Sequence, residues 1–287
     1  MIKLGLIGFP VNHSLSPKIQ NAALKACSLD GEYSLFPIAP NDMRGLKDLL
    51  ARVRSGQITG VNVTIPHKQN VIQFLDELTP TAKAIGAVNI IYMRADKVIG
   101  DNTDAPGFLS DLKKFIGTWE LKIGKSALVL GAGGSARSVV YALCNDGWNV
   151  TVAARRLEQA QQLAQSFANY PLPITTFSDP QPSTLRHVTP SSHSQGNAFD
   201  LIVNTTPIGM SPNIDESPLP ENTSLSRRSM IYDLVYNPRE TKLVKDARAQ
   251  GLKATTGLGM LIEQAMLGFE LWTGNKLSRE IFQNAVE

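Results

Sequence analysis

The chain has 287 residues, of which 43% are hydrophobic and 18% charged, and its formal net charge is +3. This composition is typical of a globular protein, and the length allows two domains. No basic block that would follow a nucleic-acid backbone is present, and no apolar run of about 18 residues that would cross a membrane. Cys27 and Cys144 lie far apart in apolar helical patterns, so we expect buried, reduced thiols and no metal site. Because the first apolar segment is too short for a signal peptide, we expect a cytoplasmic protein.

Strand-like and helical apolar patterns alternate along the first part of the chain. Such alternation is typical of βαβ units and predicts a mainly parallel sheet. Two short apolar segments on either side of a polar turn then predict a hairpin. The expected strands are Ile2–Ile7, Tyr33–Ile38 and Gly60–Ile65, the helices Pro17–Cys27, Met43–Val53 and Asp104–Ile116, and the hairpin strands Ala87–Tyr92 and Lys97–Gly100.

A second alternating set of strands and helices occupies the rest of the chain. It is interrupted by residues 178–197, which are rich in Pro, Ser, Thr, His and Gln and which we expect to form an excursion or mobile loop outside the core. The expected strands are Ser126–Leu130, Asn149–Ala153, Phe199–Val203 and Met230–Leu234, and the helices are Gly133–Leu143, Leu157–Phe167 and Leu258–Trp272.

A glycine-rich turn joins the first strand of this second set to its helix. It has the G-x-G-x-x-A spacing of a dinucleotide-binding turn, in which the first glycine permits a tight turn and the second lets a pyrophosphate approach the backbone. The anion would lie at a helix N-terminus, where free N–H groups favour negative charge. A tight turn without a ligand is the alternative. The predicted cofactor-binding residues are Gly131, Ala132, Gly133, Gly134, Ser135 and Ala136.

The end of the next strand indicates which dinucleotide is bound. An acidic residue there would accept a hydrogen bond from the ribose 2′-hydroxyl of NAD, but the chain has Arg155 and Arg156 instead. Guanidinium groups match the geometry of phosphate oxygens, so this pair favours the 2′-phosphate of NADP. A solvated basic corner at a helix start is the alternative.

These patterns predict an α/β protein of two domains. The first is a mainly parallel α/β domain over residues 1–104, with C-terminal helices in 258–287 packing back on it. The second is a Rossmann-type dinucleotide-binding domain over residues 105–257.

Three polar clusters lie next to strand ends in the first domain. In open α/β sheets, ligands bind beyond the carboxyl ends of the strands, so loops there would place these side chains around one cavity. Hydroxyls, amides, one amine and one carboxylate suit a polyhydroxylated, acidic small molecule. The residues are Ser14, Ser16, Asn62, Thr64, Lys68, Asn89 and Asp104.

Four of these residues also have an ordinary structural interpretation. Ser16 before a proline is a good helix N-cap, and Asp104 could cap the helix that follows it. Lys68 could be a solvated cation, and Asn89 could bond only backbone. The convergence of three clusters on one end of one sheet favours a site.

The chain resembles the shikimate dehydrogenase family along almost its whole length. Eight motifs in fixed order carry the resemblance, which makes it far more specific than a glycine-rich turn alone. They are HSLSP (13–17), VNVTIPHK (61–68), GAVNI (86–90), GDNTD (100–104), GAGGSAR (131–137), NTTPIGM (204–210), DLVYNP (233–238) and GLGMLIEQA (257–265).

The resemblance implies reversible NADP-linked reduction of 3-dehydroshikimate to shikimate, in chorismate and aromatic amino-acid biosynthesis. It implies that Lys68 and Asp104 are the catalytic pair, and that the first domain binds the substrate. It further implies substrate-binding roles for Ser14, Ser16, Asn62, Thr64, Asn89, Tyr236 and Gln264, and cofactor-binding roles for Thr205, Thr206, Gly257 and Met260.

Two alternatives remain open. A quinate/shikimate dehydrogenase using NAD or NADP would share the fold and accept an analogue with an extra hydroxyl. A non-catalytic module that senses NADP or shikimate would not need a proton relay, so the presence of both Lys68 and Asp104 argues against it. We expect a small-molecule substrate, no nucleic-acid or membrane partner, and a monomer or homodimer.

Overall fold

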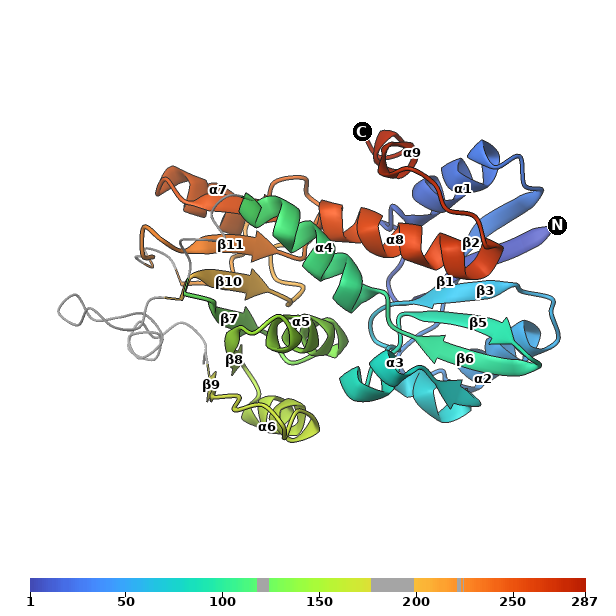
Figure 1. Ribbon diagram of the computed structural model, residues 1–287, viewed down its shortest axis with the longest axis horizontal. Coiled ribbons are helices and arrows are strands. Elements are labelled where there is room, and N and C mark those ends of the chain that lie inside the picture. Colours follow the sequence, from blue (N-terminus) through green and yellow to red (C-terminus); the bar gives the residue numbers. More distant parts are fainter. Residues whose placement is uncertain (118–123, 177–198, 221–222, 224) are drawn as a thin grey trace. The chain divides into compact units, whose positions relative to one another are not determined.

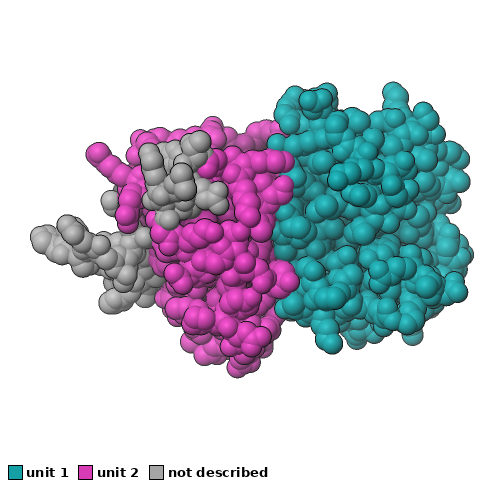
Figure 2. Space-filling model, viewed as in Figure 1, with its two compact units in different colours: residues 1–107, 261–287 teal, residues 108–260 magenta. Residues whose placement is uncertain are grey.

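The computed structural model describes residues 1–117, 124–176, 199–220, 223 and 225–287. Contacts between Cα atoms divide the chain into unit 1, residues 1–107 and 261–287, and unit 2, residues 108–260 (Figure 2). Both boundaries fall inside helices, α4 (Asp104–Ile116) and α8 (Leu258–Thr273). The polar stretch 178–197 lies outside the described residues.

The sheet of unit 1 has the strand order β2-β1-β3-β5-β6-β4 (Figure 1). Neighbours β2, β1 and β3 are parallel, β5 is antiparallel to both β3 and β6, and β4 is parallel to β6. The strands are β1 (Ile2–Gly8), β2 (Gly31–Pro37), β3 (Gly60–Val63), β4 (Glu77–Leu78), β5 (Ile90–Arg94) and β6 (Lys97–Asp101).

The reversed direction of β5 determines which segments meet at one edge of this sheet. Asn62 of β3 pairs with Ile90 of β5, and Ile90 pairs with Asp101 of β6. The carboxyl ends of β3 and β6 therefore lie beside the amino end of β5. Residues 62, 89 and 102–104, which are far apart in sequence, are brought together there.

Apolar residues at helical spacing explain how the helices of unit 1 pack. In α2, Leu46, Leu49, Leu50 and Val53 recur every three or four residues, and all are buried in a cluster with strand residues such as Val61. Helix α1 contacts β2 and α9. The helices are α1 (Ser16–Ala26), α2 (Met43–Arg54), the 3-10 helix η1 (Asn70–Phe74), α3 (Pro80–Ile85) and α9 (Arg279–Asn284).

The sheet of unit 2 is parallel throughout, with the order β12-β11-β10-β7-β8-β9. The chain runs outward from β7 to β9 on one side and from β10 to β12 on the other, so the order reverses between β7 and β10. This is the doubly wound arrangement, in which ligands bind beyond the carboxyl ends of the strands at the point of reversal. The predicted α/β class with a Rossmann-type sheet is confirmed.

Short apolar strands and amphipathic helices build this second sheet. The strands are β7 (Ser126–Leu130), β8 (Asn149–Ala154), β9 (Ile174–Thr176), β10 (Leu201–Asn204), β11 (Met230–Asp233) and β12 (Lys253–Thr256). The helices that contact them are α5 (Gly134–Asn145), α6 (Leu157–Ser166) and α7 (Lys242–Ala249).

Four local expectations were wrong. The first strand of the hairpin is β5, Ile90–Arg94, and not Ala87–Tyr92, so Asn89 precedes the strand. Strand β3 ends at Val63, so Thr64 and Ile65 follow the strand. Ser16 is the first residue of α1 and not its N-cap; instead Ser14 Oγ accepts a hydrogen bond from Ser16 N at 3.2 Å. Cys144 is buried, but Cys27 is only partly so.

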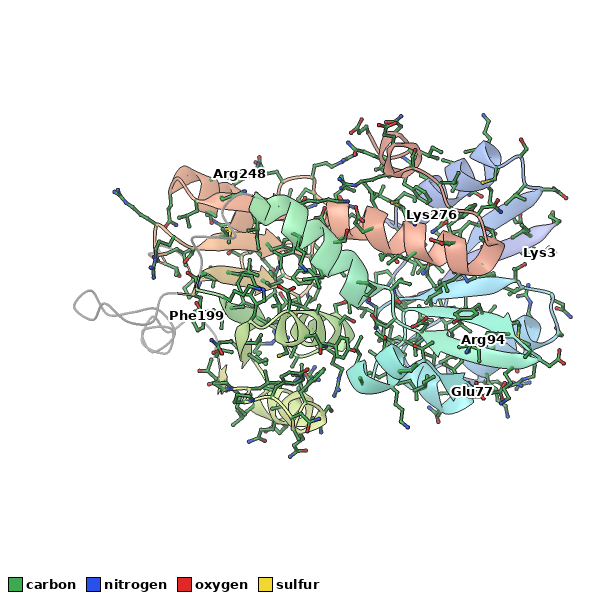
Figure 3. The ribbon with its side chains drawn as sticks, in the orientation of Figure 1. Lys3, Glu77, Arg94, Phe199, Arg248 and Lys276 are labelled. Carbon is green, nitrogen blue, oxygen red and sulfur yellow. The ribbon has the colours of Figure 1, made fainter. Side chains whose placement is uncertain are left out.

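Charged side chains line the outside of both units. Glu77 and Arg94 of unit 1 and Arg248 of unit 2 are exposed and point outward (Figure 3). Among the described residues, no helix combines the length and apolar character that a membrane span requires.

Candidate functional site

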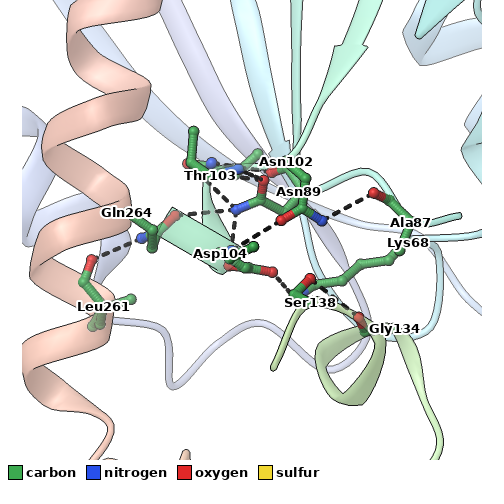
Figure 4. A network of polar contacts seen from close by, with 12 residues as sticks. Lys68, Ala87, Asn89, Asn102, Thr103, Asp104, Gly134, Ser138, Leu261 and Gln264 are labelled. Carbon is green, nitrogen blue, oxygen red and sulfur yellow. Dashed lines mark hydrogen bonds and ion pairs between the residues drawn. The ribbon is translucent and has the colours of Figure 1, made fainter. Parts of the chain in front are cut away.

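Lys68 and Asp104 form a buried ion pair in unit 1. Lys68 Nζ lies 2.6 Å from Asp104 Oδ2, and the two side chains are only 10% and 7% exposed (Figure 4). The interpretation of Lys68 as a solvated cation is therefore wrong. A contact this short and this well shielded from water allows a proton to be exchanged between the amine and the carboxylate.

Asp104 does not act as the cap of its own helix. Asn102 takes that place: its Oδ1 accepts from Ala105 N at 3.1 Å, while its Nδ2 donates to the Ala87 carbonyl at 2.9 Å. The carboxylate of Asp104 is thus directed to Lys68 and Asn89.

Asn89 holds the carboxylate in place. Its Nδ2 donates to Asp104 Oδ1 and to Thr103 Oγ1, each at 2.9 Å, and its Oδ1 accepts from Thr103 N at 2.7 Å. The interpretation that Asn89 bonds only backbone groups is therefore wrong, because its amide also bonds two side chains. Because the two oxygens of Asp104 have different partners, the carboxylate has one preferred orientation, with Oδ2 toward Lys68 (Figure 4).

Gln264 joins this network from α8. Its Oε1 lies 3.5 Å from Asn89 Nδ2, and its Nε2 donates to the Leu261 carbonyl at 2.8 Å. A Cβ atom on Gly107 of α4 would lie 2.8 Å from Gln264 N, so a glycine is required there for α4 and α8 to approach this closely. That packing brings Gln264 to the same edge of the sheet.

Asn62 lies at the same edge, on β3. Its Nδ2 donates to the Asn89 carbonyl at 3.2 Å, and its Oδ1 accepts from Tyr33 Oη at 2.8 Å. Hydrogen bonds therefore connect five of the predicted site residues of unit 1: Asn62, Lys68, Asn89, Asp104 and Gln264.

The other predicted substrate-binding residues of unit 1 are Ser14, Ser16 and Thr64, and no described hydrogen bond joins them to this network. Thr64 lies beside the end of β1, since its N–H donates to the Ile7 carbonyl at 2.8 Å and a Cβ on Gly8 would lie 2.3 Å from Thr64 Cγ2. Their contacts with a substrate stay predictions.

In unit 2 the glycine-rich turn joins β7 to α5. Gly131 has φ +111°, and a Cβ on it would lie 2.6 Å from Thr205 Oγ1, so other residues do not fit. Gly133 is the N-cap of α5 without a side-chain cap. No described atom lies within 4 Å of the position that a Cβ on it would take, which leaves room for an anion beside the start of α5, as a pyrophosphate requires.

The arginine pair lies after the next strand. β8 ends at Ala154 without a carboxylate, and both Arg155 and Arg156 are exposed. Arg156 is the N-cap of α6 and makes no side-chain cap hydrogen bond there. Neither guanidinium pairs with an acidic side chain in the described part of the chain. These residues fit the 2′-phosphate of NADP.

Thr205 and Thr206 follow β10 at the point of strand reversal. Thr205 Oγ1 donates to the Leu130 carbonyl at 2.7 Å, and Thr206 Oγ1 donates to Asn204 Oδ1 at 2.7 Å. Both hydroxyl hydrogens are used inside the protein, so a cofactor would meet these side chains as acceptors.

Asp233, at the end of β11, is a fully buried carboxylate. It is connected to Thr206 through Asn204, which bonds both residues. Asp233 Oδ1 accepts from Asn204 Nδ2 at 2.8 Å and from Val235 N at 3.0 Å, and Asp233 Oδ2 accepts from Thr241 Oγ1 at 2.7 Å. Burial raises the pKa of Asp233 to about 6, although these three hydrogen bonds oppose the shift.

The raised pKa of Asp233 predicts a pH-dependent stability. Between about pH 4 and pH 6 the folded protein retains a proton that the unfolded chain has released, so this group lowers the free energy of unfolding as the pH rises. Asp233→Asn cannot ionise. The difference in unfolding free energy, variant minus wild type, should therefore grow by on the order of 2 kcal/mol across this window and level off above it. Urea unfolding at several pH values measures it.

Asp146→Asn is the matched control in unit 2. Burial acts to raise the pKa of Asp146, but hydrogen bonds and ion pairs with Lys113 and Lys125 outweigh it and hold the pKa below its usual range. For Asp146→Asn, the difference in unfolding free energy, variant minus wild type, should fall as the pH rises. A lowered pKa in the folded state makes the wild type more stable at higher pH. If the difference in unfolding free energy for Asp233→Asn does not change between about pH 4 and pH 6, the prediction is wrong.

Tyr236, Gly257 and Met260 all belong to unit 2. Gly257 N donates to the Val235 carbonyl at 3.3 Å, and a Cβ on it would lie 2.2 Å from the Leu234 carbonyl oxygen, so this glycine allows two backbones to pack closely. Tyr236 is half-buried and Met260 is buried. Tyr236 is thus the one predicted substrate-binding residue outside unit 1.

Sequence reasoning did not assign roles to Asn102, Thr103 and Tyr33. The first two lie inside the motif GDNTD, so their position next to Asp104 was available as a signal. Tyr33 lies within a strand, where its reach to Asn62 follows only from the sheet order.

Family models match three parts of the chain. Residues 6–91 match the shikimate dehydrogenase substrate binding domain, residues 116–184 the shikimate / quinate 5-dehydrogenase model, and residues 257–287 the shikimate 5'-dehydrogenase C-terminal domain.

Similar proteins match over nearly the full length. The chain is 36% identical over 283 residues to the shikimate dehydrogenase (NADP(+)) of Bacillus subtilis, covering 98% of this chain and 95% of that protein. A shikimate dehydrogenase solved in complex with NADP+ is 37% identical, with a TM-score of 0.85 and coverage of 99% and 94% of the two chains. The Thermus thermophilus enzyme, solved with NADP(H) and shikimate, is 35% identical, with a TM-score of 0.81 and coverage of 99% and 98%.

Proposed function

Since the chain belongs to the shikimate dehydrogenase family, we propose that it interconverts 3-dehydroshikimate and shikimate, with Lys68 and Asp104 of unit 1 as the proton-transfer pair and unit 2 as the NADP-binding unit. It is an NADP-dependent oxidoreductase of the shikimate pathway, which leads to aromatic amino acids. The observation that carries the catalytic assignment is the buried contact of 2.6 Å between Lys68 Nζ and Asp104 Oδ2.

A hydride leaves or joins the carbon that carries the hydroxyl, so the chemistry needs a group that moves a proton at the oxygen bonded to that carbon. NADP, when bound, supplies or accepts the hydride. Oxidation of the alcohol releases a proton, which the Lys68–Asp104 pair takes up, and reduction of the ketone returns it. In the direction of reduction, the ammonium group of Lys68 also stabilises the negative charge that develops on the carbonyl oxygen.

The polar residues around this pair are proposed to hold the substrate. Asn62, Asn89 and Gln264 already lie in one hydrogen-bonded network with the pair, and amides of this kind bind hydroxyl and carboxylate oxygens. Ser14, Ser16, Thr64 and Tyr236 are proposed as further contacts on the strength of their motifs.

In unit 2, the turn at residues 131–136 is proposed to receive the pyrophosphate, and Arg155 and Arg156 the 2′-phosphate. The open space before α5 and the absence of a carboxylate at the end of β8 support this assignment. Thr205, Thr206, Gly257 and Met260 are proposed to lie near the rest of the cofactor.

The direct test is to mix the protein with shikimate and NADP+ and record the absorbance of reduced nicotinamide. We expect a linear increase that depends on both compounds. No increase at saturating concentrations of both would contradict the proposed function and favour a non-catalytic sensing module.

Quinate is the second candidate substrate, because the model matched by residues 116–184 covers shikimate and quinate 5-dehydrogenases. The same assay with quinate, using NAD+ and NADP+ in turn, separates the two activities. The cytoplasmic location and the monomeric or homodimeric state stay predictions.

Replacing both serines after β1 should weaken substrate binding selectively. In Ser14→Ala/Ser16→Ala, each lost hydroxyl contact should cost roughly 0.5–1.5 kcal/mol, which raises the KM for shikimate. NADP+ binding should not change, because both serines belong to unit 1 and the glycine-rich turn to unit 2. Steady-state kinetics and cofactor titration measure the two effects.

Ser55→Ala, which removes an exposed hydroxyl at the end of α2, is the control and should leave both constants unchanged. Equal weakening of shikimate and NADP+ binding in the double variant would indicate damage to folding and not a lost substrate contact.

A further inference from the structure

The side-chain amide of Asn62 has one possible orientation. Its nitrogen lies 3.2 Å from the Asn89 carbonyl oxygen, which can only accept a hydrogen bond. Its oxygen must then face Tyr33, whose hydroxyl lies 2.8 Å away and donates to it. The Asn89 carbonyl, which cannot donate, sets this orientation, and the bond from the Tyr33 hydroxyl is consistent with it.

Tyr33 is itself held firmly. It lies on β2 opposite Leu4 of β1, and Asn62 lies on β3 opposite Leu6, so the tyrosine side chain reaches past β1. Its ring is tilted against Trp272 at a centroid distance of 6.2 Å, and the residue is 4% exposed. The side chain of Asn21 bonds both the N–H and the carbonyl of Tyr33. The hydroxyl is thus fixed from the backbone and from the ring.

We infer that Tyr33 is a positioning residue for the substrate, which fixes Asn62 so that its second amide hydrogen points to a substrate oxygen. This inference rests on the proposed function. The amide has two N–H hydrogens, and Asn89 accepts only one of them. Among the described residues, no second acceptor bonds the other. A fixed donor suits a hydroxyl or carboxylate oxygen of a polyhydroxylated acid.

The test begins with Tyr33→Phe, which removes the hydroxyl and keeps the ring against Trp272. Loss of one positioning hydrogen bond should raise the KM for shikimate by roughly threefold to tenfold. We expect kcat to stay within about twofold and the dissociation constant of NADP+ to be unchanged, because Lys68 and Asp104 keep their partners.

Tyr92→Phe is the matched control. Tyr92 is a buried tyrosine on β5 of the same unit, and its hydroxyl makes no hydrogen bond to a described residue. It should leave the KM for shikimate unchanged. Thermal unfolding of both variants shows whether the fold is intact, and a change in KM shared by the two would overturn the inference.

A double-mutant cycle separates positioning from a general structural role. If Tyr33 acts through Asn62, then Tyr33→Phe should have no further effect on KM in an Asn62→Ala background. Asn62→Ser is a second background if Asn62→Ala does not fold. The same rise in KM with and without Asn62, or a fall in kcat at unchanged KM, would overturn the inference. If the wild-type protein does not oxidise shikimate at all, the proposed function is wrong. That result differs from any of the variant results, so failure of the inference and failure of the proposed function can be told apart.

Discussion

Lys68→Ala should lower kcat by about 10²-fold or more, which is the usual effect of removing a general acid–base group. The lysine is buried against Asp104, and the amide of Asn89 holds the other carboxylate oxygen. Loss of the amine therefore removes the partner through which the pair exchanges a proton with the substrate. The KM for shikimate should move much less, because Asn62, Asn89 and Gln264 remain. Steady-state oxidation of shikimate at saturating NADP+ measures both constants.

Two further variants make this prediction specific. Asp104→Asn should lower kcat on a similar scale, and the double variant should be little worse than either single variant, because residues that act as a unit are not additive. Lys47→Ala removes an exposed lysine of α2 and should leave kcat unchanged. A kcat for Lys68→Ala within about threefold of wild type would show that Lys68 does not take part in proton transfer.

NADP+ should be preferred over NAD+ by at least about tenfold in kcat/KM. A 2′-phosphate beyond β8 would meet one or two charge-assisted hydrogen bonds, each contributing roughly 1.5–3 kcal/mol, and 1.4 kcal/mol is a factor of ten. Arg155→Ala should remove most of this preference, because it should lower kcat/KM for NADP+ and leave kcat/KM for NAD+ unchanged. Titration of both cofactors at saturating shikimate, for wild type and variant, measures the effect.

The control for cofactor choice is Arg228→Ala, which removes another exposed arginine of unit 2. This variant should leave kcat/KM unchanged for both NADP+ and NAD+. Arg156→Ala should have the smaller effect of the arginine pair, since its side chain can turn along α6 into solvent. Equal efficiency with NAD+ and NADP+ in the wild type would exclude a phosphate clamp and favour the quinate/shikimate alternative.

The sequence predicts unit 2 well because its signals are local. Each parallel strand there is a short apolar run, and the glycine-rich turn has one geometry wherever it joins a strand to a helix. The elements β9, α7 and β12 were not predicted, because strands of three or four residues and a helix of eight are shorter than the windows in which periodicity is recognised.

The site in unit 1 is harder to derive from local patterns. The motifs place Asn62, Asn89 and Asp104 near strand ends, but their meeting depends on β5 running against its neighbours. The role of Tyr33 depends on the order β2-β1-β3, which puts a strand between the two residues that bond. Local patterns along the chain do not reveal such pairings, which become visible only once the order and direction of the strands are known.

Asn89 contributes its backbone and its side chain to different tasks. Its carbonyl accepts from Val63 N at 2.8 Å and its N–H donates to the Asp101 carbonyl at 3.1 Å, so it joins β3 to the end of β6. Its amide meanwhile orients Asp104. The carboxylate of Asp104, which we propose to be catalytic, is therefore aligned when the sheet forms and not when a ligand arrives. Little of the energy of substrate binding is then spent on ordering this group, and more of it remains for selecting the correct molecule.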